Sequence, residues 1–258
     1  MLPHDLRALL VDLDGVMYRG DEALPGAVDL IPTLTRLGIR YAFVTNNATL
    51  GAEGYRSKLQ GLGVPARTED IVTSAEATAA YLQQNAEPAA KVCVVGEAGL
   101  QNAIESGGFT LDDDTPAFVV VGLDRYLTYS RLVAACRGIL NGAAFIGTNP
   151  DRALPVKDGL WPGAGSIIAA VSTATDMAPR FIGKPQPTLL HVALERLGIG
   201  PDHAAIVGDQ VATDIRAGIA AGVGTILIRG DLAQESADAP PDLVVQDLSE
   251  LLAQLPFH

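Results

Sequence analysis

Residues Ala8 to Gly15 have the sequence ALLVDLDG, an apolar run that ends in two acids. We predict a buried strand over Ala8–Leu13. Asp12 and Asp14 are two residues apart, so both side chains leave an extended chain on the same side, while Leu13 points into the core. Gly15 permits a tight turn after the strand. The stretch therefore presents two carboxylates at the end of one strand.

The rest of the chain continues the same pattern. Short apolar runs alternate with amphipathic stretches, which is typical of βα units and a parallel sheet. Further strands are expected at Arg40–Val44, Ile71–Thr73, Val92–Val95, Phe118–Gly122, Ala144–Gly147, Arg180–Ile182, Ala204–Val207, Thr225–Ile228 and Leu243–Val245. Helices are expected between them, including Ala27–Leu37, Gln186–Leu197 and Thr213–Ala221, and a surface loop over Asp231–Pro241.

Three of the apolar segments end in polar residues, at Asp12–Asp14, Thr45–Asn47 and Gly208–Asp209. The carboxyl ends of the strands are where open α/β sheets bind ligands. Residues 81–179 contain βα units but no comparable polar set. We therefore expect a catalytic core made of residues 1–80 and 180–258, with a second α/β domain over residues 81–179 inserted into it.

The overall composition excludes several classes of function. The 258 residues carry a net charge of −12, which argues against nucleic acid or an anionic membrane surface as a partner. The sequence has no run of 18 apolar residues and no basic-then-apolar leader. Cys93 and Cys136 have no metal-ligand spacing and are expected to be reduced core residues. We expect a cytoplasmic protein.

Two pairs of acids suggest a cation site. The repulsion between Asp12 and Asp14 is relieved most easily by a divalent cation or a proton, both of which serve phosphoryl transfer, although the two acids could instead be ordinary turn residues. Asp209 and Asp214 are five residues apart, about 140° on a helix, so they converge only if Asp209 precedes the helix. Together the four acids offer the oxygen ligands that Mg²⁺ prefers.

Two further stretches could bind a phosphate. Thr45-Asn46-Asn47 ends a strand and offers a hydroxyl, amides and backbone donors, with a helix cap or an Asx turn as the alternative. Lys184 lies between a strand and a helix, where the helix dipole repels cations. An anion beside Lys184 would explain its position, and a solvated surface lysine is the alternative.

The order of these groups resembles the haloacid dehalogenase superfamily of phosphatases. The resemblance rests on Asp12-Leu13-Asp14-Gly15-Val16, Thr45-Asn46, Gly183-Lys184-Pro185, and Gly208-Asp209 with Thr213-Asp214-Ile215. Other stretches resemble its subfamily IIA, the NagD-like or p-nitrophenyl phosphatase branch: Thr45-Asn46-Asn47-Ala48-Thr49, Val121-Gly122-Leu123-Asp124-Arg125, Gly147-Thr148-Asn149-Pro150-Asp151 and Pro162-Gly163-Ala164-Gly165-Ser166. One departure is Thr175-Asp176, where relatives usually have Thr-Gly.

The resemblance implies a Rossmann-like parallel-sheet core with an inserted C2-type α/β cap that closes over the site. It implies that Asp12 forms an aspartyl phosphate and that Asp14 acts as general acid and then base. The implied Mg²⁺ ligands are Asp12, Asp14 through its main-chain carbonyl, Asp209 and Asp214, and the implied phosphate-binding residues are Thr45, Asn46, Asn47 and Lys184. Caps of this family often pair, which implies a homodimer through the cap.

The implied reaction is hydrolysis of a phosphomonoester of a small metabolite, whether a sugar phosphate, a nucleoside monophosphate or p-nitrophenyl phosphate. A phosphoryl-transferring mutase shares the nucleophile and remains an alternative. A phospho-accepting regulatory protein that does not turn over also pairs an aspartate with magnesium and a lysine, but it would have no inserted domain. A nucleotide-cofactor enzyme is disfavoured because no glycine-rich fingerprint follows the first strand.

Overall fold

The structure is a computed structural model that describes residues 2–87, 89–156, 159–229 and 238–255. The chain forms two compact units: the first unit contains Met1–Thr45, Ala52–Val72 and Lys184–His258, and the second contains Asn46–Gly51 and Thr73–Gly183. The second unit extends beyond the expected segment 81–179 at both ends. One reason is that α3 (Ser74–Asn85) packs against α4 (Ala98–Ser106) inside this unit.

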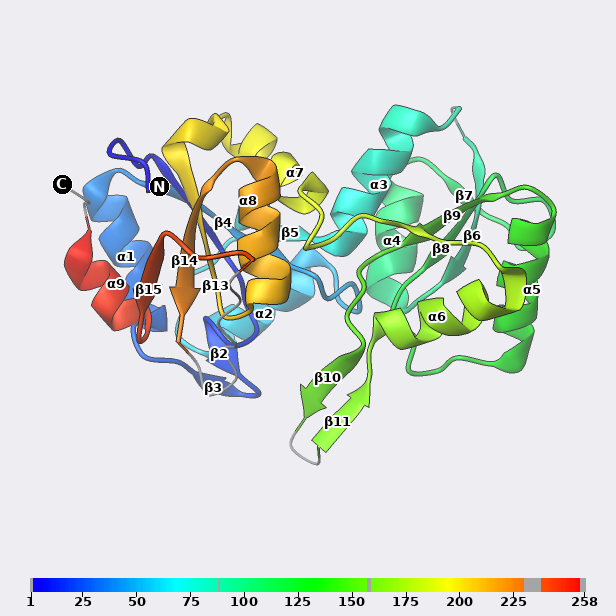
Figure 1. Cartoon of the computed structure of the whole chain (residues 1–258), viewed down its shortest axis with the longest axis horizontal. Helices are drawn as coiled ribbons and strands as arrows, with labels where there is room; N and C mark the ends of the chain where they lie inside the picture. The colour runs from blue at the N-terminus through cyan, green and yellow to red at the C-terminus, as the bar shows by residue number, and fades with distance from the viewer. Residues whose placement is uncertain (1, 88, 157–158, 230–237, 256–258) are drawn as a thin grey trace. The chain divides into compact units, whose positions relative to one another are not determined.

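The first unit is built on a six-stranded sheet with the order β15-β14-β13-β1-β4-β5 (Figure 1). The strands are β1 (Ala8–Val11), β4 (Arg40–Thr45), β5 (Ile71–Thr73), β13 (Ala204–Gly208), β14 (Gly224–Ile228) and β15 (Leu243–Val245). The pairs β1–β13, β1–β4, β13–β14 and β14–β15 are parallel. Strand β13 thus lies directly beside β1 although the two are far apart in the sequence.

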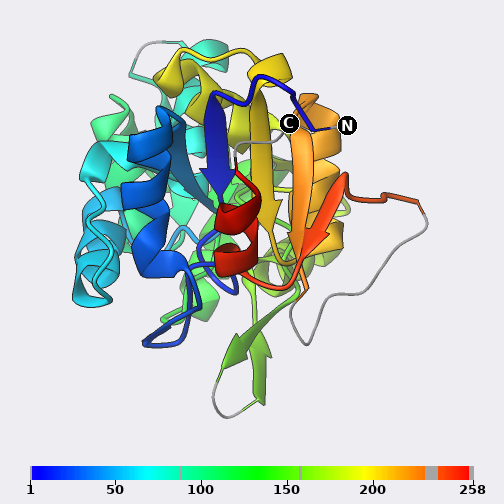
Figure 2. The same cartoon turned by 90° about the vertical axis from the view of Figure 1, so that its left-hand side faces the viewer.

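Helices cover both faces of this sheet. One face packs against α1 (Ala27–Leu37), α2 (Ala52–Gly61) and α9 (Leu248–Gln254), and α7 (Thr188–Leu197) and α8 (Arg216–Ala221) lie on the other (Figure 2). All four residues of β1 are fully buried because side chains of a strand between two helical layers face protein on both sides. Leu9 and Val11 belong to the core under α1 and α9.

The second unit has its own five-stranded sheet, in the order β12-β9-β8-β6-β7. Its strands are β6 (Lys91–Val95), β7 (Thr110–Leu111), β8 (Phe118–Val121), β9 (Ala144–Gly147) and β12 (Arg180–Phe181). Helices α3 and α4 lie on one face, and α5 (Tyr129–Leu140) and α6 (Ala164–Thr175) lie on the other (Figure 1). A separate hairpin is formed by β10 (Ala153–Val156) and β11 (Gly159–Pro162).

All the expected strands form, with changes at their ends. The strand expected over Ala8–Leu13 stops at Val11, because the chain turns and Leu13 accepts the amide hydrogen bond of Met17. The short pairs β2 (Tyr18–Arg19) and β3 (Glu22–Ala23), strand β7 and the hairpin β10–β11 were not predicted. Strands β2, β3 and β7 are only two residues long and carry no apolar run that could reveal them.

Two expected helices begin at residues other than those predicted. The helix expected from Gln186 starts at Thr188, because the chain enters it through Pro187, whose fixed φ suits the position before the first turn. The helix expected over Thr213–Ala221 is a π-helical turn, Val211–Ile215, followed by α8. The remaining short helical turns are Thr68–Asp70 and Pro201–His203.

Three further expectations can be compared with the structure. Asp176, the departure from Thr-Gly, ends α6 with φ 56°, a left-handed conformation that Asp tolerates better than most residues. The loop expected over Asp231–Pro241 falls mainly on residues 230–237, outside the described residues. Within the described part of the chain, no helix combines the length and the apolar character that crossing a membrane requires.

Candidate active site

The parallel register brings three polar strand ends to one edge of the first unit's sheet. Val11 of β1 is paired with Val207 of β13 on one side and with Phe43 of β4 on the other. The amide of Asp12 continues this ladder by donating to the Val207 carbonyl at 2.9 Å. Asp12, Thr45 at the end of β4 and the residues after β13 therefore meet at the carboxyl edge.

Lys184 is the cation at this edge. Its Nζ donates to Asp12 Oδ1 and to Asp214 Oδ1, each at 2.6 Å, and its side chain is only 2% exposed. The alternative of a solvated surface lysine is therefore wrong. An anion is expected beside Lys184 from its place in the sequence, and in the structure two carboxylates of the first unit occupy that position.

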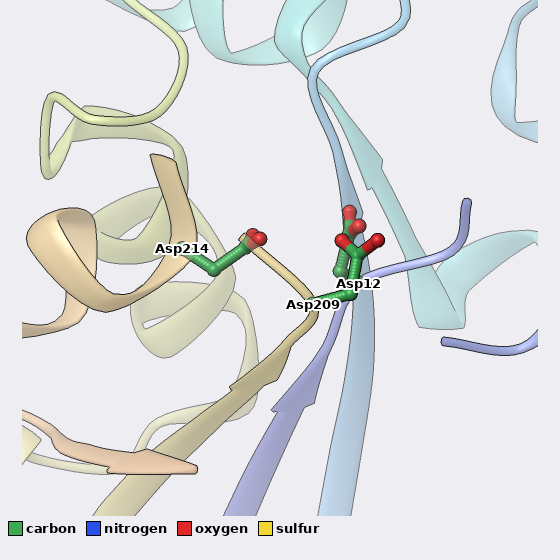
Figure 3. A group of neighbouring side chains, drawn as sticks. All are labelled: Asp12, Asp209 and Asp214. Atoms are coloured by element: carbon green, nitrogen blue, oxygen red, sulfur yellow. The ribbon is translucent and has the colours of Figure 1, made fainter. Parts of the chain in front are cut away.

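Three acids converge around the same point. One oxygen each of Asp12, Asp209 and Asp214 lies within 4.8 Å of the others. Figure 3 shows Asp12 and Asp209 at the ends of their strands, with Asp214 pointing toward them from the following helical turn. Asp209 precedes that turn, as the five-residue spacing between Asp209 and Asp214 requires if the two acids are to converge. Asp214 Oδ2 is held by the Gln210 amide at 3.2 Å and the Thr213 hydroxyl at 3.3 Å.

Two glycines give these carboxyl groups room. A Cβ on Gly15 would lie 2.1 Å from Asp209 Oδ2, and Gly15 has φ +84°. A Cβ on Gly208 would lie 2.1 Å from the Asp214 Cβ. Contacts this short are impossible for real side chains, so both positions need glycine for the acids to approach the strand ends.

The electrostatics of the site favour a bound cation. Burial raises the pKa of Asp12, an effect that the Lys184 ammonium opposes and the carboxylates of Asp214 and Asp209 reinforce. Burial, followed by the neighbouring Asp214 carboxylate, raises the pKa of Asp209 to about 7. Burial would lower the pKa of Lys184, but the two carboxylates beside it raise that pKa overall. The Lys184 ammonium therefore balances only part of the negative charge of Asp12, Asp209 and Asp214.

The donor set fits a small divalent cation. Asp209 Oδ1 is buried and has no hydrogen-bond partner among the described residues. Carboxylate oxygens are the ligands that hard cations prefer, and a buried oxygen without a partner costs free energy unless a cation or a proton satisfies it. Asp12, Asp209 and Asp214 could therefore hold a metal ion, with Asp209 Oδ1 left open for it.

Asp14 is separate from this group of three. Its side chain is exposed, and its Oδ2 accepts a hydrogen bond from the Tyr18 hydroxyl at 3.4 Å. The protein packed around the carboxyl partly desolvates it and raises the pKa of Asp14, while the Lys58 ammonium acts in the opposite direction. The participation of Asp14 in metal binding stays a prediction.

The residues after β4 divide between the units. Thr45 is buried in the first unit, whereas Asn46 and Asn47 belong to the second. The Asn46 amide donates to Asp151, and the Asn47 Oδ1 accepts from the amide and hydroxyl of Thr49 at 3.0 and 2.8 Å. The Asn47 contacts form the turn that the sequence analysis kept as an alternative. Phosphate binding by Asn46 and Asn47 stays a prediction.

Two residues near Asp14, Tyr18 and Lys58, were not predicted from the sequence. Tyr18 lies four residues after Asp14, so its position in the turn could have drawn attention to it. Lys58 on α2 places its Nζ 3.6 Å from the centre of the Tyr18 ring. No pattern in the sequence links Lys58 to Asp14, because only the packing of α2 against the turn brings them together.

We predict that Gly15→Ala weakens divalent-cation binding about tenfold or more, because the new Cβ displaces the Asp209 carboxylate. Isothermal titration with Mg²⁺ measures the affinity. Gly20→Ala is the matched control, since Gly20 also has a positive φ, +60°, but a Cβ there meets nothing within 4 Å. Equal affinities in the two variants would show that the Gly15 contact does not hold Asp209 in place.

Comparisons with known proteins agree with this architecture. Residues 9–110 match the haloacid dehalogenase-like hydrolase family, and residues 181–251 match a HAD-hydrolase-like family. The chain is 40% identical over 254 residues to an acid sugar phosphatase of Staphylococcus aureus (strain USA300), covering 96% of this chain and 98% of the relative.

Solved structures give the same result. A 4-nitrophenylphosphatase from Thermotoga maritima superposes with a TM-score of 0.90 at 35% identity, over 97% of each chain. A protein assigned as NagD superposes with a TM-score of 0.92 at 34% identity, over 98% of this chain and 99% of its own. At these levels of identity and coverage, the chain belongs to the haloacid dehalogenase-like hydrolase family.

Proposed function

We propose that the protein is a magnesium-dependent phosphatase that hydrolyses phosphomonoesters of small metabolites through an aspartyl phosphate on Asp12. The observation that carries this proposal is the buried Asp12 carboxylate, which lies beside Lys184 and two further acids at the carboxyl edge of the sheet. The relatives support the reaction class, because one is named a sugar phosphatase and another a 4-nitrophenylphosphatase.

Asp12 is the proposed nucleophile. One of its carboxylate oxygens forms a bond to phosphorus while the bond between phosphorus and the ester oxygen breaks. The hydrogen bond from Lys184 to Oδ1 holds the carboxylate in one orientation and keeps a positive charge beside the incoming phosphoryl group. Burial removes the water that would otherwise compete for the carboxylate.

Asp14 is the proposed general acid and base. It gives a proton to the departing ester oxygen and then takes one from the water that attacks the aspartyl phosphate, so the second step restores the proton lost in the first. Two observations support this role: the side chain is exposed to an incoming molecule, and its surroundings raise its pKa.

Asp12, Asp209 and Asp214 are the proposed magnesium ligands, together with Asp14 through its main-chain carbonyl. Bound there, Mg²⁺ would neutralise negative charge on the phosphoryl oxygens. The three acids are fixed by this chain itself: Asp12 by Lys184, Asp214 by Lys184 and Gln210, and Asp209 by its fit against Gly15.

The phosphoryl oxygens are proposed to contact Thr45, Asn46, Asn47 and Lys184. Thr45 is supported by its place at the end of β4, next to β1. Asn46 and Asn47 rest on the family resemblance. We assign the first unit as the catalytic core and the second as the cap, with the unit boundaries given above.

Two broader assignments complete the proposal. The surface of α5 carries exposed large apolar side chains, among them Tyr129 at 82% and Leu140 at 65%, which supports a homodimer through the cap. Both cysteines are free thiols, which supports a cytoplasmic location.

A phosphate-release assay across a panel of phosphorylated metabolites with Mg²⁺ tests the function directly. We expect release of inorganic phosphate from p-nitrophenyl phosphate and from at least one sugar phosphate. Transfer of the phosphoryl group within the substrate, without release, would identify a mutase instead. A stable phosphoprotein with no turnover would identify a phospho-accepting regulator.

We predict that Asp12→Asn abolishes turnover, because an amide cannot form the aspartyl phosphate. The activity should fall at least about a thousandfold in the same assay, with circular dichroism unchanged. The fold survives because Lys184 keeps its ion pair with Asp214 and the amide keeps the shape of the side chain beside it. Residual hydrolysis at about a tenth of the normal rate would refute Asp12 as the nucleophile.

Magnesium binding should weaken in acid. With a pKa of about 7, Asp209 is protonated below neutral pH and ionised above it, so a cation must displace its proton at low pH. The apparent Mg²⁺ affinity should therefore fall about tenfold for each pH unit below about 7. Calorimetric titrations at several pH values measure the slope, and a slope that is the same in Asp209→Asn would contradict this assignment.

A further inference from the structure

We propose that Tyr18 and Lys58 are positioning residues, which hold the Asp14 carboxyl in the orientation that delivers its proton to the leaving group. The inference rests on the proposed role of Asp14 as general acid. Neither residue touches the reacting atoms in this scheme: Tyr18 acts through Asp14, and Lys58 acts on Asp14 through the Tyr18 ring that it contacts and through the charge of its ammonium.

The Tyr18 hydroxyl holds the side chain of the exposed acid Asp14. Asp14 lies in a turn with its side chain exposed, so packing alone does not hold the side chain in one rotamer. Tyr18 is fully buried, and its hydroxyl donates to Asp14 Oδ2 at 3.4 Å. Hydrogen bonds of catalytic groups are often long in free enzymes and shorten when substrate is present. The buried phenol is therefore a fixed point from which the mobile carboxyl is held.

Backbone hydrogen bonds connect Tyr18 to the turn that carries Asp14. The Gly15 amide donates to the Tyr18 carbonyl at 2.9 Å, and the Tyr18 amide donates to the Leu13 carbonyl at 3.3 Å. Both ends of the turn that presents Asp14 are thus hydrogen-bonded to Tyr18. The backbone of Tyr18 therefore keeps a fixed position relative to the turn that carries Asp14, and the hydroxyl hydrogen bond then restricts the carboxyl.

Lys58 fixes the ring. Its ammonium lies 3.6 Å from the centre of the Tyr18 ring, within the range of a cation–π contact. Lys58 is carried by α2, whose Tyr55 and Leu59 are buried in the same core as Tyr18. The contact holds the plane of the ring, and with it the direction in which the hydroxyl points.

The arrangement assigns different roles to the two oxygens of Asp14. Because Oδ2 accepts the Tyr18 hydrogen bond, the transferable proton resides on Oδ1. When the ester bond breaks, the leaving oxygen takes the Oδ1 proton, and the Tyr18 hydroxyl stabilises the resulting carboxylate through Oδ2. The attacking water then returns a proton to Oδ1.

Leaving-group dependence tests the inference. The parameter kcat/KM reports the steps up to alcohol release, and p-nitrophenolate departs without needing a proton, whereas a sugar alkoxide needs one. Tyr18→Phe should lower kcat/KM about tenfold for the best sugar phosphate of the panel, and less than about twofold for p-nitrophenyl phosphate. Equal losses with both substrates, or no loss with either, would overturn the inference.

Tyr41→Phe is the matched control. It deletes one hydroxyl that donates to an aspartate of the same unit, Asp70 Oδ2, at 3.1 Å. Tyr41 is near the start of β4, away from the strand ends where the site lies. We expect kcat/KM to stay unchanged for both substrates. A leaving-group-dependent loss in this variant would show that the effect follows from any tyrosine deletion, and would also overturn the inference.

Lys58 is tested by a pair of substitutions. Lys58→Met keeps the apolar stem but removes the charge over the ring, so it should reproduce the selective loss with the sugar phosphate at smaller size. Lys58→Arg keeps a cation over the ring and should keep kcat/KM close to that of the unchanged protein. A Met variant that retains full kcat/KM with the sugar phosphate would remove Lys58 from the proposal.

Asp14→Asn separates the inference from the function on which it rests. If this variant loses kcat/KM equally with both substrates, the role of Asp14 as general acid fails. If it shows the selective loss and Tyr18→Phe does not, only the positioning role fails. Tyr18→Phe should cause no additional selective loss in the Asp14→Asn background, because the group that it positions is already absent.

Discussion

The first unit depends on one buried ion pair network, the contact of the Lys184 ammonium with Asp12 and Asp214. A buried charge is tolerated only when it is paired and hydrogen-bonded, and removing one partner leaves the others unpaired. Lys184 is the first residue of the segment that returns to this unit. The network therefore joins the end of β1, the turn after β13 and the returning chain, and it fixes the same carboxylate that is proposed to attack phosphorus.

The site contains more carboxyl groups than Lys184 can pair with, and this explains why Asp209 is suited to bind a cation. Lys184 satisfies one oxygen of Asp12 and one of Asp214, but Asp209 Oδ1 is left without a partner among the described residues. A divalent cation would relieve this excess, because the groups that are costly in the free protein would become its ligands. The proposed cation would also explain how a chain with a net charge of −12 attracts an anionic phosphate.

The sequence predicted the strands because their signals are local, and three of the four acids that it singled out, Asp12, Asp209 and Asp214, lie together in the structure. Apolar runs revealed every strand of the first unit's sheet, and the polar residues after them indicated the edge where a site would form. It failed where the signal is short or absent: β2 and β3 lack an apolar run, and α8 is preceded by a π-helical turn that hydrophobic periodicity does not reveal. Tyr18 resembled an ordinary core aromatic, and Lys58 an ordinary helix lysine.

The amino-acid sequence by itself determined the α/β class, the order of the motifs and the family, because these depend on periodicity and on residues close together along the chain. Only the tertiary structure decided which acids meet. Asp12 lies beside Asp209 because β13 pairs with β1, Lys184 is shared by two carboxylates, and Asp14 stands apart, held by Tyr18. Such contacts join residues distant in the chain, and they arise from strand pairing and packing, which no local pattern encodes.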